Sequence, residues 1–419
     1  MKNQLFLLIG LAFILKMNAQ TVIIPNEYDS RAITTGLPFV LIASDARAAS
    51  MGDMGVATSV DAFSQQWNAS KYAFSETKSG IAVSYTPYLS KLVNDIFLGN
   101  ATYFNRLDDR SAFAASFRYF SLGDIEIITQ GQVAAGNLTP LIERPNELAI
   151  DASYSLRLSD QYAMSVAMRY LRSDLRIQAS DEYSDAGAAN TFGVDVSGYY
   201  QSEEIPYSDF YGRWRGGFAL QNIGPKFKYD DGGQESFQPT TLRLGGGFDF
   251  IFDSYNTLSL TAEVTKLLVP TPPLLASEYE YTDNNGNGQY DEDEDTRGAL
   301  VRDRFVYKGK SDDVGFLQGM FQSFGDAPGG FSEEMKEFTW ALGAEYKYQD
   351  SFSFRTGYFN ESEDKGARKF LALGAGFKAN VVNIDLSYLF STSKVQSPLE
   401  NTLRFSLTFN IGSGTYTEY

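Results

Sequence analysis

The stretch ELAIDASYSLRLSDQYAMSVAMRY, residues 147–170, decides the fold class of this chain. Apolar side chains stand at every second position of 148–158, and small or charged side chains fill the positions between them. After a short break the alternation resumes over 162–170. A period of two puts alternate side chains on opposite faces of a β-strand, so the stretch predicts two antiparallel strands joined by a tight turn.

Similar runs return along most of the chain, and their length favours a membrane barrel over a soluble sandwich. Each holds about ten residues, as tilted transmembrane strands do, whereas strands of soluble proteins usually hold about five or six. The fourteen runs lie near 79–88, 95–105, 111–121, 147–158, 160–172, 190–201, 213–223, 240–252, 256–268, 337–348, 351–360, 368–379, 380–391 and 400–411. An even number of strands can close antiparallel with no free edge, as hydrocarbon demands.

The connections between the runs alternate in length. They are mostly short after even-numbered runs, with residues 202–212 as an exception. After odd-numbered runs they include the long segments 122–146, 173–189, 224–239 and 269–336. Because bacterial barrels have short periplasmic turns and long outer loops, we expect both termini on the periplasmic side. The sequence thus predicts an all-β membrane protein: a barrel of about fourteen strands over 78–411, a long extracellular loop at 269–336 and a periplasmic tail at 412–419.

The composition agrees with a barrel and excludes several kinds of chemistry. Aromatic residues make up 15% of the 419 residues and glycines number 37, which suits a barrel with aromatic girdles at both membrane interfaces. The absence of cysteine and histidine removes disulfides, thiolate metal sites and the commonest general base, so we expect no enzyme of these kinds. A formal net charge of -17 argues against nucleic acid as a partner.

Residues 1–19 are predicted to be a signal peptide. Lys2 precedes an apolar run at 5–15, and Ala19 supplies a small residue before the cut, so we expect the mature chain to begin at Gln20. The apolar run is too short to span a bilayer as a helix. No cysteine follows the cleavage site, so we expect no lipoprotein anchor.

Residues 20–77 precede the first strand and are expected to form a hatch in the lumen. Alanines around Asp45 and Arg47 predict a short helix, 51–55 a glycine turn, and 61–72 a second helical piece. A segment of this size folds poorly on its own. Packing inside the barrel would supply the core that it lacks.

The stretch SDARAASMGDMGVA at 44–57, followed by Trp67-Asn68-Ala69, resembles the start of the PorV (LptO) family. Members are outer-membrane components of the type IX secretion system of Bacteroidetes, built like the FadL fatty-acid transporters with fourteen strands and an N-terminal hatch. The residues that carry the resemblance are Asp45, Arg47, Met51, Gly52, Asp53, Gly55, Trp67 and Asn68. Ala69 departs from the pattern, since many relatives have proline there.

The resemblance implies a role in protein secretion. PorV-like proteins associate with the giant translocon barrel, recognise the C-terminal signal domain of a secreted cargo and pass the cargo to a cell-surface sortase and attachment complex. Outer-membrane lipid would surround the barrel. Sister families such as PorQ share the style of the motif. The alternative is a FadL-like transporter of hydrophobic small molecules, because the two roles share a fold and fold alone does not separate them.

Residues 283–294, DNNGNGQYDEDE, fit the pattern of a calcium loop, and calcium is the only cofactor that the sequence suggests. Side-chain oxygens would come from Asp283, Asn285, Asn287, Asp291 and Glu294, and a carbonyl from Gln289, with Gly288 at the sharp turn. The flanking residues do not resemble EF-hand helices, and acidic surface loops also occur for solubility alone.

The long outer loop also contains a roughly helical apolar stripe, formed by Phe316, Leu317, Met320, Phe321 and Phe324. Apolar surface in an outer loop needs a partner. The stripe either packs on the barrel rim or contacts the translocon or the cargo, and the sequence leaves both interpretations open.

Charged residues recur on the side of the predicted strands that faces the lumen. They are Asp151, Arg157, Arg169, Asp195, Arg213, Arg215, Glu263, Glu345, Lys347 and Arg404. Such charges could line a selective pore, but buried charges must pair, so we expect them to neutralise one another and to hold the hatch. The glycines at 245–247 follow no strand-to-helix turn and indicate a bend or close packing against the hatch rather than a phosphate loop.

Overall fold

The computed structural model describes residues 20–26, 30–90, 93, 95–136, 138–176, 187–230, 232–394, 398–400 and 402–412. The predicted signal peptide, and all of the predicted C-terminal tail except residue 412, lie outside these ranges.

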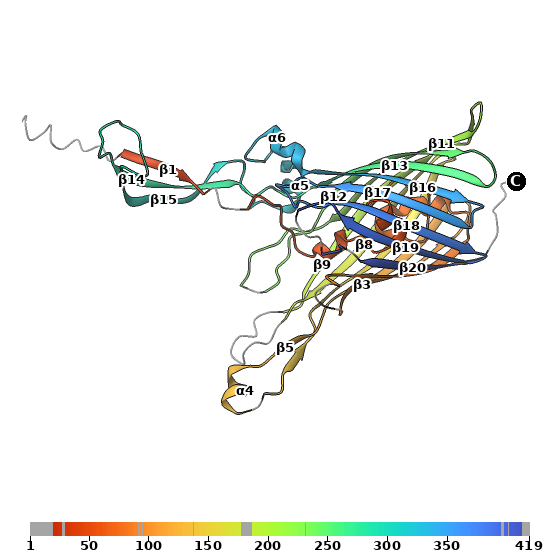
Figure 1. Cartoon of the computed structure of the whole chain (residues 1–419), viewed down its shortest axis with the longest axis horizontal. Helices are drawn as coiled ribbons and strands as arrows, with labels where there is room; N and C mark the ends of the chain where they lie inside the picture. Colours follow the sequence, from red (N-terminus) through yellow and green to blue (C-terminus); the bar gives the residue numbers. More distant parts are fainter. Residues whose placement is uncertain are drawn as a thin grey trace, which may run out of the picture.

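Fourteen antiparallel strands form a closed barrel (Figure 1). They are β2 (Ser79–Pro87), β3 (Ile96–Arg106), β4 (Ser111–Leu122), β7 (Asn146–Ser159), β8 (Tyr162–Asp174), β9 (Ala189–Gln201), β11 (Tyr211–Ile223), β12 (Thr241–Ile251), β13 (Asn256–Leu267), β16 (Phe338–Tyr348), β17 (Phe352–Asn360), β18 (Lys369–Ala379), β19 (Val382–Ser391) and β20 (Leu403–Ile411). Neighbours in this order pair with each other, and β20 pairs with β2 to close the ring. The predicted fourteen-stranded barrel is therefore confirmed, and each predicted run overlaps one of these strands.

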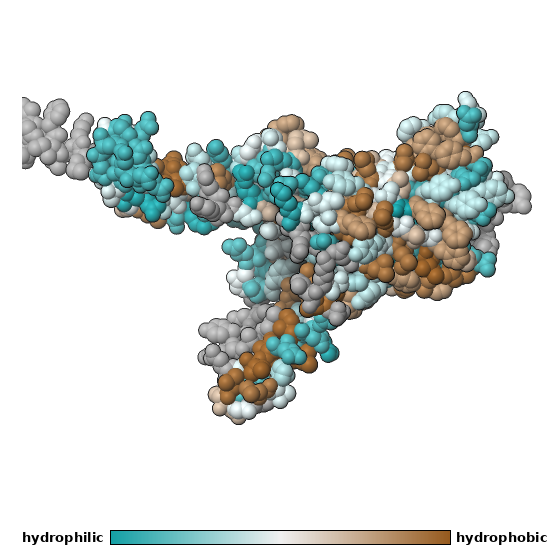
Figure 2. Space-filling model, viewed as in Figure 1, coloured by the Kyte–Doolittle hydropathy of each residue, from teal (hydrophilic) through white to brown (hydrophobic). Residues whose placement is uncertain are grey.

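The alternation along the strands separates a lipid face from a lumenal face. In β7, Ile150 and Tyr154 are exposed on the outer wall, whereas Asp151 and Ser155 are buried inside the barrel. This arrangement is the reverse of that in a soluble protein, and it is stable because hydrocarbon surrounds the ring. Figure 2 shows the resulting apolar side chains on the barrel wall. Among the described residues, no helix is long and apolar enough to cross a membrane.

Residues that precede β2 fill the lumen as four short helical pieces. They are η1 (Pro38–Leu41), α2 (Ala46–Ser50), α3 (Ser64–Trp67) and η2 (Ala69–Phe74). Phe39 packs with Leu98 and Leu171 of the wall, and Met51 packs in a second cluster with Phe359. The core of this protein therefore lies between the hatch and the inner face of the barrel.

The outer end of the barrel carries an arm that the sequence did not predict. The 269–336 loop was expected to be a long connection, but it contains β14 (Leu274–Thr282) and β15 (Thr296–Lys308), which pair as an antiparallel hairpin. The strand β1 (Gln20–Pro25) adds to β14, and the three strands project away from the barrel in Figure 1. We call this three-stranded sheet and its 283–295 tip the arm.

The arm also corrects the expected topology of the N-terminus. The backbone N–H of Lys78 donates to the carbonyl of Gly412, so β2 begins beside the C-terminal end of β20. Residues 20–25 lie at the opposite end, on the side of the long loops (Figure 1). The expectation that both termini lie on one side is therefore wrong, because residues 20–25 pair with β14 on the arm and do not lie at the end that carries Gly412.

Three further groups of elements stand on the connections. The connection after β4 forms a hairpin of β5 (Ile125–Ile127), α4 (Gln130–Ala134) and β6 (Leu141–Glu143). The connection after β15 contains α5 (Phe316–Gln322), α6 (Phe331–Glu334) and η3 (Met335–Glu337). Finally, β10 (Ile205–Pro206) pairs with β11 in the loop of 202–210.

Candidate functional site: the hatch, the lumen and the outer loops

Asp45 and Arg47 fix the first helix of the hatch. Asp45 caps α2 by accepting a hydrogen bond from the N–H of Ala48 at 2.7 Å, and its other oxygen accepts one from the indole of Trp67 at 2.9 Å. Arg47 donates to both carboxylate oxygens of Glu345 in β16, at 3.0 and 2.8 Å, and its guanidinium also pairs with Asp61 at 2.6 Å. The two halves of the motif are thus joined to each other and to the wall.

The glycine turn and the Trp67-Asn68 pair are bound to the wall as well. The N–H groups of Gly55 and Val56 donate to one oxygen of Glu263, at 2.8 and 2.9 Å. Asp53 pairs with the buried Arg404 at 3.1 Å. The Asn68 amide donates to the carbonyls of Val56 and Gly198, both at 2.9 Å. These contacts place the turn against several strands far away in the sequence.

Five wall glycines form a seat for the hatch. They are Gly217, Gly245, Gly343, Gly357 and Gly374, and a Cβ atom at any of them would lie within 3 Å of a hatch atom. A Cβ at Gly217 would lie 2.2 Å from the carbonyl oxygen of Val56, and one at Gly357 would lie 2.0 Å from the carbonyl carbon of Met51. The close packing expected at Gly245 is therefore present, because its Cβ would lie 2.6 Å from Val56.

Most of the predicted lumenal charges are paired. Asp151 binds Arg118 and Arg169, and Arg169 also binds Asp195 at 2.9 Å. The other pairs within the wall are Arg215–Asp249 at 2.7 Å, Arg243–Glu263 at 3.0 Å, Arg355–Glu345 at 2.7 Å and Lys347–Glu345 at 3.7 Å. Arg213 instead pairs with Glu204, and Arg157 stacks over Phe74 of the hatch at 5.0 Å. The charges therefore hold the hatch and each other, as expected.

Two cavities lie on opposite sides of the hatch. The one at the short-turn end has a volume of about 820 Å³ and is lined by charged residues such as Asp253, Asp350 and Lys378. The one at the outer end, also about 820 Å³, is lined by apolar and aromatic side chains together with charged ones. The apolar lining includes Phe39, Phe120, Phe359, Tyr88, Leu122 and Leu175, and the charged lining is Asp53, Glu147, Arg243, Glu337, Glu361, Lys365 and Arg368. The outer cavity can therefore accommodate an apolar group.

The 283–294 segment forms the tip of the arm, and its predicted ligands take part in hydrogen bonds within the loop. Asp283 accepts hydrogen bonds from the N–H groups of Gly286 and Gly288, at 2.6 and 2.8 Å. The Asn285 and Asn287 amides donate to Asp291 at 3.1 and 2.6 Å, and Asn285 also donates to Glu294 at 2.7 Å. Gln289 donates its N–H to Asn287, and Gly288 has a φ of +76°. The backbone wraps as the sequence pattern requires.

Some side chains of the predicted apolar stripe are packed against the protein, and others are exposed. Met320 is buried and Phe316 is half-buried, whereas Leu317, Phe321 and Phe324 are exposed. Two further exposed side chains in the same loop, Phe331 and Met335, lie on α6 and η3, and Phe321 and Phe331 are each 78% exposed. The sequence did not single them out, because they sit singly among glutamates and a lysine rather than in a periodic stripe. We call the five exposed side chains the loop patch.

A second exposed apolar surface was also missed. The hairpin of β5, α4 and β6 exposes Ile128, Val133, Leu138, Leu141 and Ile142, and Figure 2 shows it as an apolar projection from the outer end. The sequence indicates the helix α4 of this hairpin through a capping box. The Thr129 side chain accepts a hydrogen bond from the N–H of Gln132, and the Gln132 side chain accepts one from the N–H of Thr129.

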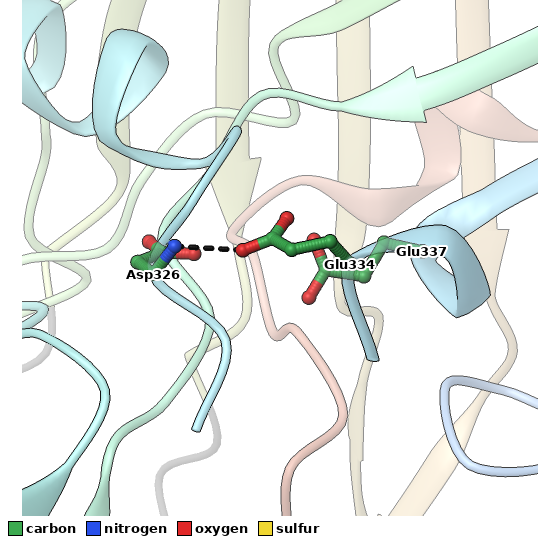
Figure 3. Close-up of side chains that lie close together, drawn as sticks. All are labelled: Asp326, Glu334 and Glu337. Atoms are coloured by element: carbon green, nitrogen blue, oxygen red, sulfur yellow. Dashed lines mark hydrogen bonds between the residues drawn. The ribbon is translucent and has the colours of Figure 1, made fainter. Parts of the chain in front are cut away.

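Three buried carboxylates meet beneath the loop patch, from Asp326, Glu334 and Glu337 (Figure 3). Their nearest oxygens lie within 4.8 Å of one another, as the ligands of a metal would. The ammonium of Lys266, however, lies 2.6 Å from Glu337 and 3.5 Å from Glu334. Glu334 also accepts from the N–H groups of Asp326 and Ala327, at 2.7 and 2.8 Å. Lys266 therefore occupies the place of a cation in this cluster.

Of the three carboxylates in the cluster, Asp326 has the fewest hydrogen-bond and ion-pair partners among the described residues. One of its oxygens accepts from the N–H of Thr271 at 3.2 Å, and the other is buried without a hydrogen-bond partner. Burial, together with the charges of Glu334 and Glu337, raises the pKa of Asp326 to about 6, although the Thr271 hydrogen bond opposes the shift. This loop carboxyl therefore titrates close to neutral pH.

Solved structures with similar folds include three outer-membrane proteins. The Pseudomonas putida toluene transporter TodX is 11% identical, with 91% of this chain and 98% of that chain covered and a TM-score of 0.46. A FadL homologue of Pseudomonas aeruginosa is 11% identical, with 91% and 100% covered and a TM-score of 0.43. The Ralstonia pickettii toluene transporter TbuX is 11% identical, with 88% and 97% covered and a TM-score of 0.42.

Sequence comparisons identify a family. No curated protein matches the chain significantly. The profile of the family described as type IX secretion system protein PorV matches residues 25–274, which is more than half of the chain. The matched region includes the whole hatch and nine of the fourteen barrel strands, up to β13. This chain therefore belongs to the PorV family and is an outer-membrane β-barrel component of the type IX secretion system.

Proposed function

We propose that this barrel is a cargo carrier of the type IX system. It associates with the translocon barrel, binds the C-terminal signal domain of secreted cargo and delivers the cargo to the cell-surface sortase and attachment complex. The observation that carries the proposal is the loop patch, five apolar side chains exposed at the outer end of the barrel. Exposed aromatic side chains of this kind are typical of protein interfaces, where they supply much of the binding energy.

The sealed lumen supports docking rather than passage of protein. The hatch is joined to the wall by Glu263, Glu345 and Arg404, and it lies in close contact with the wall at five glycines. A folded cargo domain is far wider than a fourteen-stranded lumen filled in this way. The proposed work of the protein is therefore binding at its outer surface, with chemistry carried out by other components.

The test replaces both Phe321 and Phe331 with Ser in the full-length protein. Both side chains are almost fully exposed, so the fold should be retained. We expect co-purification of the translocon barrel or of a signal-domain cargo to fall at least about tenfold, as loss of two interface anchors would cause. Tyr255→Ser is the matched control, because Tyr255 is an exposed aromatic in a turn at the opposite end.

Cargo location provides the second readout. In cells that carry only the Phe321/Phe331 variant, secreted proteins should accumulate in the periplasm, while the Tyr255 variant should secrete normally. If both variants retain the translocon and the cargo at wild-type levels, the loop patch is not the recognition surface. If complete deletion of the protein leaves secretion intact, the carrier role itself is wrong.

The outer cavity favours a second candidate function, the transport of hydrophobic small molecules. Its volume and aromatic lining would accept an apolar solute, although the hatch separates it from the polar cavity at the other end. Deletion distinguishes the two functions. Failure to take up a fatty acid or a monoaromatic compound, with protein secretion unaffected, would favour transport over cargo delivery.

We further propose that the 283–294 tip binds one calcium ion that orders the arm. Asp291 and Glu294 accept hydrogen bonds from the amides of Asn285 and Asn287, and Asp283 accepts from the N–H of Gly288 at the sharp turn of the same loop. Hard oxygen ligands on a flexible, wrapping backbone are what calcium needs. The charge of the ion would also offset the repulsion among these carboxylates.

Calorimetry on the intact protein in detergent tests the calcium proposal. We expect binding of about one ion per chain with a dissociation constant between about 10 µM and 1 mM, the range of exposed calcium loops. The Asp283→Asn/Glu294→Gln variant should lose this binding, while Asp312→Asn, outside the tip, should keep it. An absence of heat with the unchanged protein would contradict the proposal.

A further inference from the structure

The arm ends in an unpaired strand edge. Among the residues that the structure describes, the strand order is β1-β14-β15, so β15 pairs on one side only. All of its thirteen residues except Phe305 are exposed. The outer main-chain N–H and C=O groups of such a strand can pair with another chain, which is the basis of recognition by strand addition. Strands in globular proteins usually hold about 3–10 residues, so an exposed edge strand of thirteen residues is unusually long.

The other edge of the same hairpin already holds an added strand. The chain's own N-terminal residues form β1 and pair with β14 over six positions, from Gln20 opposite Tyr281 to Pro25 opposite Ala276. The rest of the barrel fold does not require this pairing, because β1 belongs to a sheet separate from the barrel. The hairpin therefore binds an extended segment through its main chain on one side and offers the equivalent edge on the other.

Charge distinguishes the two edges. The β1 strand has no charged side chain, whereas β15 has four cationic side chains and only one carboxylate, Asp303. The guanidinium groups of Arg297 and Arg302 lie over the rings of Tyr279 and Phe305, at 4.8 and 4.2 Å. The rest of the arm is acidic, with Glu278 and Glu280 in β14 and six carboxylates in the 283–295 tip, so β15 is a cationic strand within an acidic arm. Its charges oppose pairing with a second copy of β15 and attract carboxylates.

We propose that the outer edge of β15 binds an extended acidic segment of a partner chain by strand addition. Main-chain hydrogen bonds would supply the affinity, and carboxylates on one face of the partner strand would meet Arg302 and Lys308, which stand opposite β14 residues of the same face. This surface lies on the arm and is separate from the loop patch. The proposal holds whether or not the barrel carries cargo.

Peptide binding to the full-length protein in detergent tests the proposal. The probe is a fluorescent ten-residue peptide of alternating Glu and Val, measured by anisotropy. A peptide of alternating Lys and Val tests the role of charge. A third peptide has the acidic sequence with alternate backbone nitrogens methylated, which removes main-chain donors and leaves the side chains unchanged. We expect the acidic peptide to bind at least about tenfold more tightly than either of the others, since several hydrogen bonds or charge contacts would be lost.

The matching protein variant replaces Arg297, Arg302 and Lys308 with Glu, which should reverse the preference toward the lysine peptide. Arg144→Glu, an exposed cation in a different outer loop, is the control and should bind as the unchanged protein does. The methylated peptide requires no variant, so the test stands even if the substituted arm folds poorly. Equal binding of the methylated and unmethylated acidic peptides, or no binding of the acidic peptide, would overturn the proposal.

Discussion

At the scale of single residues, Asp326 shows what happens when a buried charge has too few partners. Glu337 and Glu334 share the ammonium of Lys266, and Lys365 lies 3.1 Å from Glu337. In the described part of the chain Asp326 forms no ion pair and accepts one hydrogen bond, from the N–H of Thr271, while Lys266 acts on its charge only from a longer distance. The pKa of Asp326 is raised because the folded protein favours the neutral, protonated carboxyl over the charged one. The loop that contains Asp326 is therefore sensitive to pH.

The sign of the pH effect follows from the direction of this shift. The folded protein binds the proton more tightly than the unfolded chain, so the stabilisation is complete below about pH 4 and is lost as the pH rises through about 6. A shift of this size corresponds to at most about 3 kcal/mol. Asp326→Asn should therefore stabilise the loop at pH 7.5 and have a much smaller effect at pH 4.5.

Hydrogen exchange of residues 331–337 at the two pH values measures this prediction. Asp312→Asn serves as the control, because Asp312 is an exposed carboxyl in the same loop. Equal protection in the Asp326 variant and the unchanged protein at pH 7.5 would mean that Asp326 costs the folded loop nothing.

At the scale of elements, the hatch is held by shape as well as by charge. Gly217 and Gly216 are neighbours in β11 and point to opposite sides of the wall. A Cβ at Gly217 would collide with Val56, whereas one at Gly216 would meet nothing within 4 Å. The two glycines thus offer a matched pair that separates packing against the hatch from a general effect on the strand.

Gly217→Val should displace the hatch and destabilise the protein by about 1–3 kcal/mol or more, the usual cost of overpacking. Gly216→Val should be neutral, because its side chain would face lipid. Limited proteolysis of the 43–74 segment in the purified protein, followed by mass spectrometry, reports hatch release. Equal protease resistance in the two variants would show that the hatch adapts to the added side chain.

The elements also differ in how far the sequence could predict them. Each barrel strand has lipid on one side, which imposes a period of two on its side chains. This local pattern was enough to predict all fourteen barrel strands from the sequence. The arm strands β14 and β15 have solvent on both sides and four irregular steps in their register, so no alternation marked them. The hatch motif was visible in the sequence, but its partners Glu263, Glu345 and Arg404 lie hundreds of residues away, and spacing cannot pair them.

At the scale of the whole molecule, the two ends of the described chain lie on opposite sides of the membrane. The β1 strand sits on the arm at the outer end, and residue 412 lies beside the start of β2 at the other end. Single cysteines test this arrangement cleanly, since the chain has no cysteine of its own.

Thr21→Cys should react with a membrane-impermeant maleimide on intact cells, because Thr21 is exposed in β1. Ser254→Cys, in an exposed turn between β12 and β13, should react only after the cells are broken. Labelling is read on the purified barrel by mass shift. Protection of position 21 together with labelling of position 254 on intact cells would invert the orientation.

The path of the N-terminal segment constrains how this protein is made. Between β1 and β2 the chain runs from the arm, through the lumen as the hatch, to the opposite rim. The barrel thus surrounds the N-terminal segment of its own chain. Either this segment lies between the strands before β2 and β20 pair, or it must pass through the lumen of the closed barrel afterwards. Biogenesis of this protein therefore includes a step of hatch placement that a barrel with an empty lumen would not have.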